Sequence, residues 1–350
     1  MRPIVRHLIK LILWGIAAIA VVACIFLFRL IHIGMPERAM SLQFQGYVRL
    51  PKGALLTVLD YLTISDQHLF VTDESTGNVY KIALQNNALP RSGDVSVLSS
   101  VPAAHGVALD PAKRVAYVTR SKVNAVDVFD PATMRQAVRI PVADDPDAII
   151  FDSFHNVIYV ANGDARVATL IDPETRSVIS TIPLGGKPEF MAFDSRTNLV
   201  YQNLRDTNTV AAVDVGARSV LQGWNLSGCS EPTGMAIDEL GRRLFIACAG
   251  NAMLAIFDLS THSVTASISI GKGPDSVAFD PELHRIYTAG KAGVLTVIRQ
   301  DTPDAYHVVD SIKLHYGAHT LAIDPATHNL YVGYASLLVR SRVAMFTPRL

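Results

Sequence analysis

Short apolar segments separated by polar turns run through most of the chain. Between residues 147 and 184, the apolar segments end at turns such as Asn162-Gly163-Asp164 and Asp172-Pro173. Short segments rich in β-branched residues, bounded by Asp, Asn, Gly and Pro, are typical of β-hairpins. The pattern therefore predicts antiparallel strands and leaves no room for a helix of useful length between the turns.

An aromatic residue opens a short apolar strand in each of seven repeats. These aromatic residues follow one another at intervals of 42 to 47 residues. Repeats of that length are typical of propeller blades, which contain four antiparallel strands each. We therefore predict an all-β fold, a seven-bladed β-propeller of four-stranded blades. The aromatic residues are Phe70, Tyr117, Tyr159, Tyr201, Phe245, Tyr287 and Tyr331.

The two ends of the repeat region complement each other. The last repeat ends with the strand at residues 343–346 and lacks an outer strand. The segment Val48-Arg49-Leu50-Pro51 resembles the outer strands Val138-Arg139-Ile140-Pro141 and Ser180-Thr181-Ile182-Pro183. We predict that this N-terminal strand completes the seventh blade, which would close the ring without an open sheet edge.

The first 40 residues differ in kind from the repeats. Arg2, Arg6 and Lys10 precede an apolar run at residues 11–28, which is near the length that crosses a bilayer as a helix. Basic residues before such a run favour a cytoplasmic N-terminus. We therefore predict two regions: a transmembrane helix, as membrane anchor or signal segment, with a linker at residues 1–40, and the propeller at residues 41–350.

Two kinds of processing compete with a retained anchor. A signal peptide needs a small-residue cleavage site followed by polar chain. The stretch Val21-Val22-Ala23-Cys24 resembles a bacterial lipobox, in which Cys24 would be lipidated. Because residues 25–28 stay apolar, we favour the uncleaved anchor. All three alternatives export the propeller. With the uncleaved anchor we predict a location at a bacterial inner membrane, with the propeller facing the periplasm or the cell exterior.

The balance of charges argues against one class of partner. The chain has 31 basic and 31 acidic residues, so we expect no binding of nucleic acid.

Cys229 and Cys248 lie near the fifth repeat. A disulfide between them is sterically allowed and would persist outside the cytoplasm, and two unpaired thiols are the alternative. The sequence contains no Cys-x-x-Cys motif that would indicate zinc or haem.

Three segments resemble a known repeat motif. Tyr117-Val118-Thr119-Arg120, Tyr159-Val160-Ala161-Asn162 and Tyr331-Val332-Gly333-Tyr334 are similar to the motif of the YVTN seven-bladed propellers, which include exported YncE-like proteins. The resemblance covers residues 41–346 at the level of the repeat. It implies the fold and says little about function, because the motif residues are structural.

One position per repeat lies where an inner strand begins, and the ring should bring these positions to one mouth of the central channel. Imidazole nitrogens and carboxylate oxygens there can ligate a divalent metal or act as acid and base. Polar residues in a hydrated funnel without any ligand are the alternative. The candidate ligand- or metal-binding residues are His105, Asp147, Glu189, Asp275 and His319, with Thr233 in the fifth repeat and Thr57 or Val58 in the first.

A second set of polar residues follows the aromatic strands and is predicted to form an outer rim around the same mouth. Such residues could select an anionic or sugar-like ligand, although each alone is also compatible with a solvated loop face. The rim candidates are Arg120, Asn162, Arg166 and Arg205, together with Lys122, Asn203, Lys291 and Tyr334.

The sequence lacks the local motifs of several enzyme classes, including Gly-x-Ser-x-Gly, His-Glu-x-x-His and Gly-x-Gly-x-x-Gly. We therefore expect a membrane-tethered extracytoplasmic propeller that binds a small-molecule ligand or an envelope protein. A metal-assisted hydrolase or lyase, similar to propeller lactonases, is the alternative. An accessory to periplasmic redox or metal handling is the third hypothesis.

Overall fold

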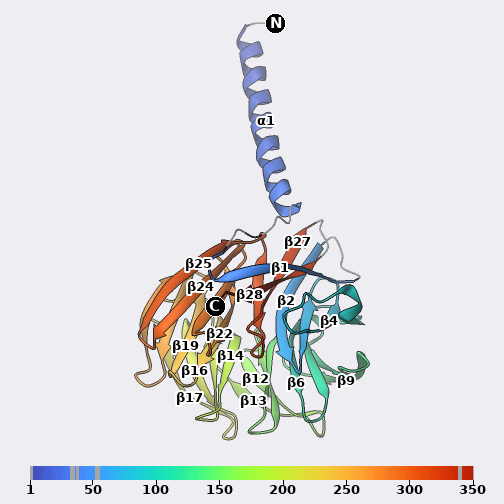
Figure 1. The fold of residues 1–350 in the computed structure, drawn as a ribbon, viewed down its shortest axis with the longest axis vertical. Helices are drawn as coiled ribbons and strands as arrows, with labels where there is room; N and C mark the ends of the chain where they lie inside the picture. Colours follow the sequence, from blue (N-terminus) through green and yellow to red (C-terminus); the bar gives the residue numbers. More distant parts are fainter. Residues whose placement is uncertain (1–2, 32–35, 37–38, 52–55, 338–340, 350) are drawn as a thin grey trace.

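The structure, a computed structural model, describes residues 3–31, 36, 39–51, 56–337 and 341–349. In this part of the chain, helix α1 (Pro3–Ile31) is followed by strands β1 to β28. Figure 1 shows α1 extending away from a ring of twisted antiparallel sheets. The predicted seven-bladed propeller of four-stranded blades is confirmed.

The first three blades hold their strands in chain order from the channel outward. Two short 3₁₀ helices, Ser92–Asp94 and Ser121–Val123, interrupt the loops. The first blade has β2 (Leu56–Ser65), β3 (His68–Asp73), β4 (Asn78–Ala83) and β5 (Val95–Ser99). The second has β6 (Ala104–Asp110), β7 (Val115–Arg120), β8 (Ala125–Asp130) and β9 (Arg135–Pro141). The third has β10 (Pro146–Asp152), β11 (Val157–Asn162), β12 (Val167–Asp172) and β13 (Ser177–Pro183).

The next three blades repeat this order, and the seventh takes its outer strand from the start of the chain. The fourth blade has β14 (Pro188–Asp194), β15 (Leu199–Leu204), β16 (Thr209–Asp214) and β17 (Ser219–Asn225). The fifth has β18 (Pro232–Asp238), β19 (Arg243–Cys248), β20 (Met253–Asp258) and β21 (Ser263–Ser269). The sixth has β22 (Pro274–Asp280), β23 (Arg285–Gly290), β24 (Val294–Thr302) and β25 (Ala305–Lys313). The seventh has β26 (Ala318–Ile323), β27 (Leu330–Leu337), β28 (Arg342–Pro348) and β1 (Leu42–Arg49).

Aspartates that end inner strands organise the turns that follow. The Oδ1 atom of Asp152 accepts hydrogen bonds from the backbone N–H groups of Phe154 and His155, each at 3.0 Å. Asp280 accepts from Glu282 and Leu283 in the same way, each at 3.1 Å. Such Asx turns offer the backbone an alternative to continued strand pairing, so they stop one strand and start the next.

The aromatic residues of the repeat pack between neighbouring blades. Tyr117 of the second blade packs with Ile158 and Val160 of the third, and Tyr159 packs with Val200 of the fourth. Both tyrosine side chains are fully buried. Each large ring buries about 150–250 Å² of its surface, so the repeating aromatic residue contributes a large apolar contact between one blade and the next.

Strand β1 lies antiparallel against β28, with pairs that run from Leu42–Pro348 to Arg49–Arg342. Val48 is fully buried in an apolar cluster that includes Leu59 of the first blade and Val343 of the seventh. Strand β2 also pairs with β27, which links the first blade to the seventh. Residues from both ends of the chain therefore share one core at this junction.

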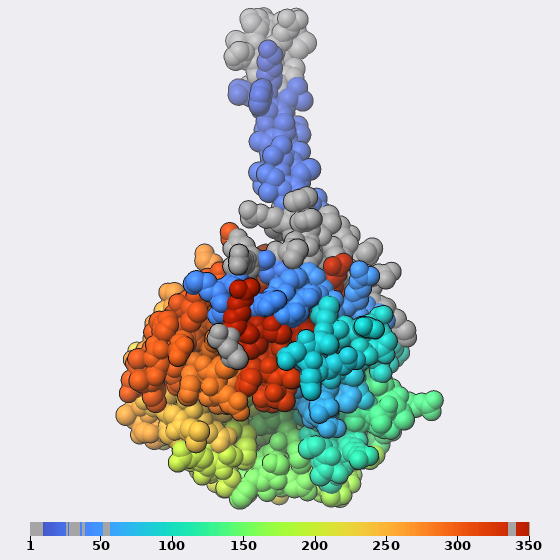
Figure 2. All heavy atoms as spheres, in the orientation of Figure 1, coloured from blue at the N-terminus to red at the C-terminus, as the bar shows by residue number. Residues whose placement is uncertain are grey.

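Helix α1 extends away from the propeller body in Figure 2, and its described apolar side chains, such as Leu11, Trp14, Val22 and Leu27, are exposed. Within the described residues, no helix meets the length and hydropathy of a membrane-spanning segment, so the predicted transmembrane helix is not supported. Cys24, the candidate for lipidation, is an exposed free cysteine on α1. Arg2 of the predicted basic cluster lies outside the described residues.

A charge placed in the β1 core should destabilise the whole propeller. We expect Val48→Asp to lower the free energy of unfolding by roughly 3 kcal/mol or more, because an unpaired carboxylate would replace a buried side chain. Urea denaturation of the full-length protein measures this. Gln43→Asp, which adds the same charge at an exposed position of β1, should cost at most about 1 kcal/mol. Equal stability of the two variants would show that β1 is not part of the cooperative fold.

Candidate functional site

The inner strands bring one residue each to the mouth of the central channel. In β6, β10, β14, β22 and β26 this residue is the second of the strand. The pairing of each inner strand with its neighbour is irregular there, as between Pro146 and Ile149 of β10. Such an irregularity changes the direction in which the side chains point, compared with a regular strand. The residues so placed are His105, Asp147, Glu189, Asp275 and His319.

The structure brings these predicted residues together. His105, Asp147, Glu189 and Asp275 line one cavity of about 200 Å³. His319 lies beside it, because its Nε2 atom is 3.8 Å from Oδ2 of Asp275. Thr233, the equivalent residue in β18, instead bonds to the backbone of Pro274 in the neighbouring blade.

The first blade contributes Asp60, which the sequence analysis missed in favour of Thr57 or Val58. In β10 and β11 the last pair is Asp152–Val157, whereas in β2 and β3 it is Ser65–His68. The first hairpin is therefore two residues shorter, and counting back from the aromatic residue stops two residues too early. The turn consists of Asp66 and Gln67, both with positive φ, and this short polar dipeptide was the signal in the sequence.

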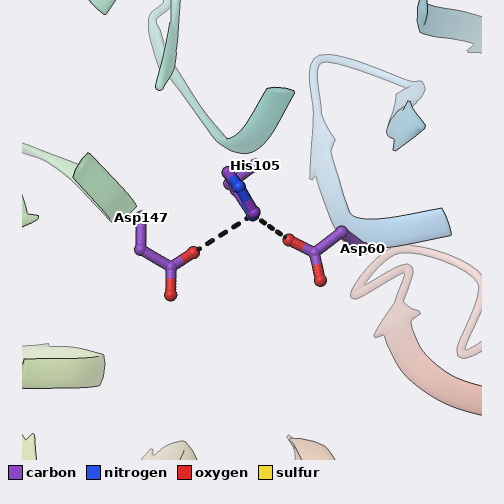
Figure 3. Close-up of side chains that lie close together, drawn as sticks. All are labelled: Asp60, His105 and Asp147. Atoms are coloured by element: carbon purple, nitrogen blue, oxygen red, sulfur yellow. Dashed lines mark hydrogen bonds and ion pairs between the residues drawn. The ribbon is translucent and has the colours of Figure 1, made fainter. Parts of the chain in front are cut away.

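Three residues form the first cluster, which Figure 3 shows with their side chains pointing toward one another. Nδ1 of His105 lies 2.5 Å from Oδ2 of Asp60 and 3.6 Å from Oδ1 of Asp147. Nε2 of His105 lies 2.9 Å from the hydroxyl of Ser121. Oδ1 of Asp147 is buried and has no hydrogen-bond partner. One nitrogen and two carboxylate oxygens thus lie within 4.8 Å of one another, in an arrangement able to hold a metal ion.

A second cluster shares Asp60 with the first. Its three ligand atoms, from Asp60, Asp275 and His319, also lie within 4.8 Å of one another. Nε2 of His319 is 4.0 Å from Oδ1 of Asp60, while Nδ1 of His319 is 2.7 Å from the carbonyl of Gly317. The hydrogen bond at Nδ1 fixes the orientation of the ring and turns Nε2 toward the two carboxylates.

Two aromatic rings form the floor of the cavity. The rings of Tyr61 and Phe190 stack with centroids 4.8 Å apart and an angle of 15° between their planes. The same two residues line a second, largely apolar cavity of about 370 Å³ farther along the inner strands. The ring pair therefore lies where the polar cavity and the apolar cavity meet. Burial, together with the nearby carboxylates, raises the pKa of Tyr61 well above its ordinary value, so this phenol stays neutral.

The carboxylates change the protonation of the first cluster. Burial lowers the pKa of His105, but the hydrogen bond that its ring donates to Asp60 and the charges of Asp60 and Asp147 outweigh burial and raise this pKa to about 9. Burial raises the pKa of Asp147 above its ordinary value, against the opposing charge of His105. Burial likewise raises the pKa of Glu189, although Arg205 acts in the other direction. The mouth thus concentrates negative charge that needs a proton or another cation.

The predicted outer rim is only partly at the mouth. Arg205 and Lys291 line the cavity, where Arg205 pairs with Glu189 at 3.2 Å and Lys291 with Asp275 at 3.4 Å. Lys187, which was not predicted, also lines it.

Three of the other rim candidates pair away from the cavity. Arg120 is buried and pairs with Asp127 at 2.9 Å. Asn162 is buried and donates to the carbonyl of Ala143. Arg166 pairs at 2.6 Å with Asp206, on the loop between β15 and β16. Arg120 bonds within its own blade, Asn162 bonds to the loop that enters its own blade, and Arg166 bridges two loops.

A disulfide joins Cys229 and Cys248, with Cα atoms 5.3 Å apart. Cys229 lies in the loop before β18, and Cys248 ends β19. Both residues are buried. The bridge ties the entry loop of the fifth blade to its second strand.

Comparison with known proteins places the chain in a family. A family model described as the Choice-of-anchor I domain matches residues 59–274, which is more than half of the chain. The chain belongs to the Choice-of-anchor I domain family. The match includes Asp60, His105, Asp147 and Glu189 and ends just before Asp275. The narrower resemblance to YVTN and YncE-like propellers is not confirmed.

Solved structures support the fold of this Choice-of-anchor I domain. Hydrazine synthase of Kuenenia stuttgartiensis superposes with a TM-score of 0.70, covering 83% of this chain and 96% of that chain at 16% sequence identity. In all, 1659 chains of solved structures match. A likeness shared by so many chains indicates the fold but does not indicate the function. No curated protein matches the chain.

The protonated His105 should make the stability of the metal-free protein depend on pH. Its folded pKa of about 9 exceeds the ordinary 6.5, so its contribution is fully present below about pH 6.5 and is lost as the pH rises through about 9. We expect a loss of up to about 3 kcal/mol across this interval in buffer with a chelator. Thermal unfolding at a series of pH values measures it. In His105→Gln the decline should be shallower, and parallel curves for both proteins would contradict the assignment.

Proposed function

We propose that this Choice-of-anchor I domain is an extracytoplasmic binding module whose channel mouth holds a divalent cation. The observation that carries the proposal is the convergence of Asp60, His105 and Asp147 from three separate blades. An imidazole nitrogen with two carboxylate oxygens is a ligand set that suits zinc and manganese.

The distances between the ligand atoms are close to those of a metal site. Around a tetrahedral ion with bonds of about 2.0 Å, ligand atoms lie roughly 3.3 Å apart. The 3.6 Å between His105 and Asp147 is near that value, and the 2.5 Å between His105 and Asp60 requires the Asp60 carboxylate to withdraw by less than about 1 Å. If the Nδ1 proton of His105 passed to solvent, the Nδ1 lone pair could bind a cation while Nε2–H donates to the Ser121 hydroxyl, so that the second hydrogen bond is kept.

The surroundings of the cluster favour a cation over a plain hydrated funnel. Oδ1 of Asp147 is buried without a hydrogen-bond partner and faces the cluster. A buried carboxylate oxygen in that state is costly unless a proton or a cation neutralises it. The lysine and arginine side chains that line the cavity pair with other carboxylates: Lys187 with Asp145 and Asp164, Arg205 with Glu189, and Lys291 with Asp275.

The compartment is part of the same proposal. The Cys229–Cys248 disulfide is a bond that persists in oxidising environments and is rare in the cytosol. We propose that the propeller faces the periplasm or the cell exterior and that α1 attaches it to a membrane surface. Support comes from the exposed apolar side chains of α1, such as Leu11, Trp14 and Val22.

A metal-assisted hydrolase or lyase is compatible with this site but requires a bound cation first. The likeness to hydrazine synthase gives no clear catalytic support. Cation binding is therefore the property to test before any activity.

Titration with Zn²⁺ tests the proposed cation site. After removal of metals with a chelator, the full-length protein should bind Zn²⁺ in isothermal titration calorimetry, and His105→Ala should lose the tightest binding event because a ligand nitrogen is removed. His307→Ala provides the matched control, since His307 is an exposed histidine on β25 that pairs with Asp301. Survival of the tightest Zn²⁺ binding event in His105→Ala, or no binding by the unsubstituted protein, would refute the proposal.

Reduction of the disulfide tests the proposed compartment. The bridge closes a loop with a sequence separation of 19 residues, and its loss should lower the free energy of unfolding by about 3 kcal/mol. The full-length protein, purified from its own cells without reductant, should lose this stability in urea denaturation when reductant is added. Cys24→Ser should show the same loss, because Cys24 is not part of the bridge. Identical stability with and without reductant would argue against an oxidising compartment.

A further inference from the structure

Asp60 presents its two carboxylate oxygens to two different histidines. Oδ2 lies 2.5 Å from Nδ1 of His105, and Oδ1 lies 4.0 Å from Nε2 of His319. Each histidine has one further carboxylate beside it, Asp147 for His105 and Asp275 for His319. The two clusters thus have the same composition and meet at a single shared residue.

We propose that the channel mouth is a two-cation centre in which Asp60 bridges two divalent cations. The first position is that of the proposed function, on which this inference rests. The second position is formed by Asp60, Asp275 and His319.

The hydrogen bonding of His319 argues for a cation at the second position. Its side chain is only 3% exposed, and its Nδ1–H donates to the carbonyl of Gly317 at 2.7 Å. In the neutral ring, Nε2 then carries a lone pair, which faces the carboxylate oxygens of Asp60 and Asp275. A lone pair against two anionic oxygens is unfavourable without a positive charge between them, and a divalent cation supplies one.

The spacing suits a pair of ions. The 3.8 and 4.0 Å distances from Nε2 of His319 exceed the roughly 3.3 Å of a tetrahedral site by about half an ångström, which a small side-chain movement removes. Two ions bound to the two oxygens of one carboxylate lie a few ångströms apart, as in two-metal sites, where about 3.5–4 Å is usual.

The two positions should differ in affinity because of Lys291. Its ammonium lies 3.4 Å from Oδ2 of Asp275 and partly neutralises that carboxylate. The lysine side chain is 60% exposed, so it can turn away when a cation binds. The second position should therefore bind more weakly than the first, and removal of the lysine charge should strengthen it.

Calorimetric titration of the chelator-treated, full-length protein with Mn²⁺ tests the proposal. We expect two equivalents, one tight and one weaker. His319→Ala should lose only the weaker equivalent, and Asp60→Asn should lose or greatly weaken both. Lys291→Gln should tighten the weaker equivalent severalfold and leave the tight one unchanged, a gain that a misfolded variant would not show.

The outcomes separate this inference from the proposed function. One equivalent in the unsubstituted protein, unaffected by His319→Ala, would overturn the second position and leave the first standing. Two equivalents of which Asp60→Asn removes only one would overturn the bridging role. No bound Mn²⁺ or Zn²⁺ at all would overturn both proposals. His307→Ala should keep both equivalents, as the histidine control.

Discussion

The pairing of each inner strand with the next strand of its blade determines what the channel mouth contains. In every described blade that pairing is irregular near the mouth, so the residue there leaves the regular alternation of the strand. The tightly packed aromatic residues between blades hold these strands in a ring. Side chains far apart in the sequence, such as Asp60 and His319, are therefore held a few ångströms apart by the fold.

This geometry concentrates carboxylates around two histidines at the polar cavity. The stacked rings of Tyr61 and Phe190 line this cavity. Burial makes uncompensated negative charge costly. For this reason the pKa values of His105 and Asp147 are both raised when no metal is bound. A proton on His105 compensates the negative charge of the first cluster only at moderate pH. A divalent cation compensates this charge without a proton, which is why the same residues fit a metal site.

Much of the fold could be predicted from the sequence, because the aromatic residue of each repeat is a packing residue that recurs with the blade. The mouth position was predictable wherever the inner hairpin kept its usual length, as for His105 and Asp147. It was missed at Asp60, since a hairpin shortened by two residues breaks the spacing. Spacing alone does not report a change in turn length.

The sequence also could not show which of the predicted rim residues face the cavity. Arg120 and Asn162 are the last residues of β7 and β11, and they face into the sheets. Arg205 and Lys291 follow directly after β15 and β23 and face the cavity. A shift of one residue moves a side chain to the other face of a strand, so composition could name basic residues near the mouth but could not say which of them reach it.

The most direct test of the central claim is anomalous diffraction from crystals of the full-length protein soaked in Mn²⁺. The account predicts an anomalous peak bounded by Nδ1 of His105 and the carboxylates of Asp60 and Asp147. The absence of a peak there, in crystals that show Mn²⁺ bound at other sites, would contradict it.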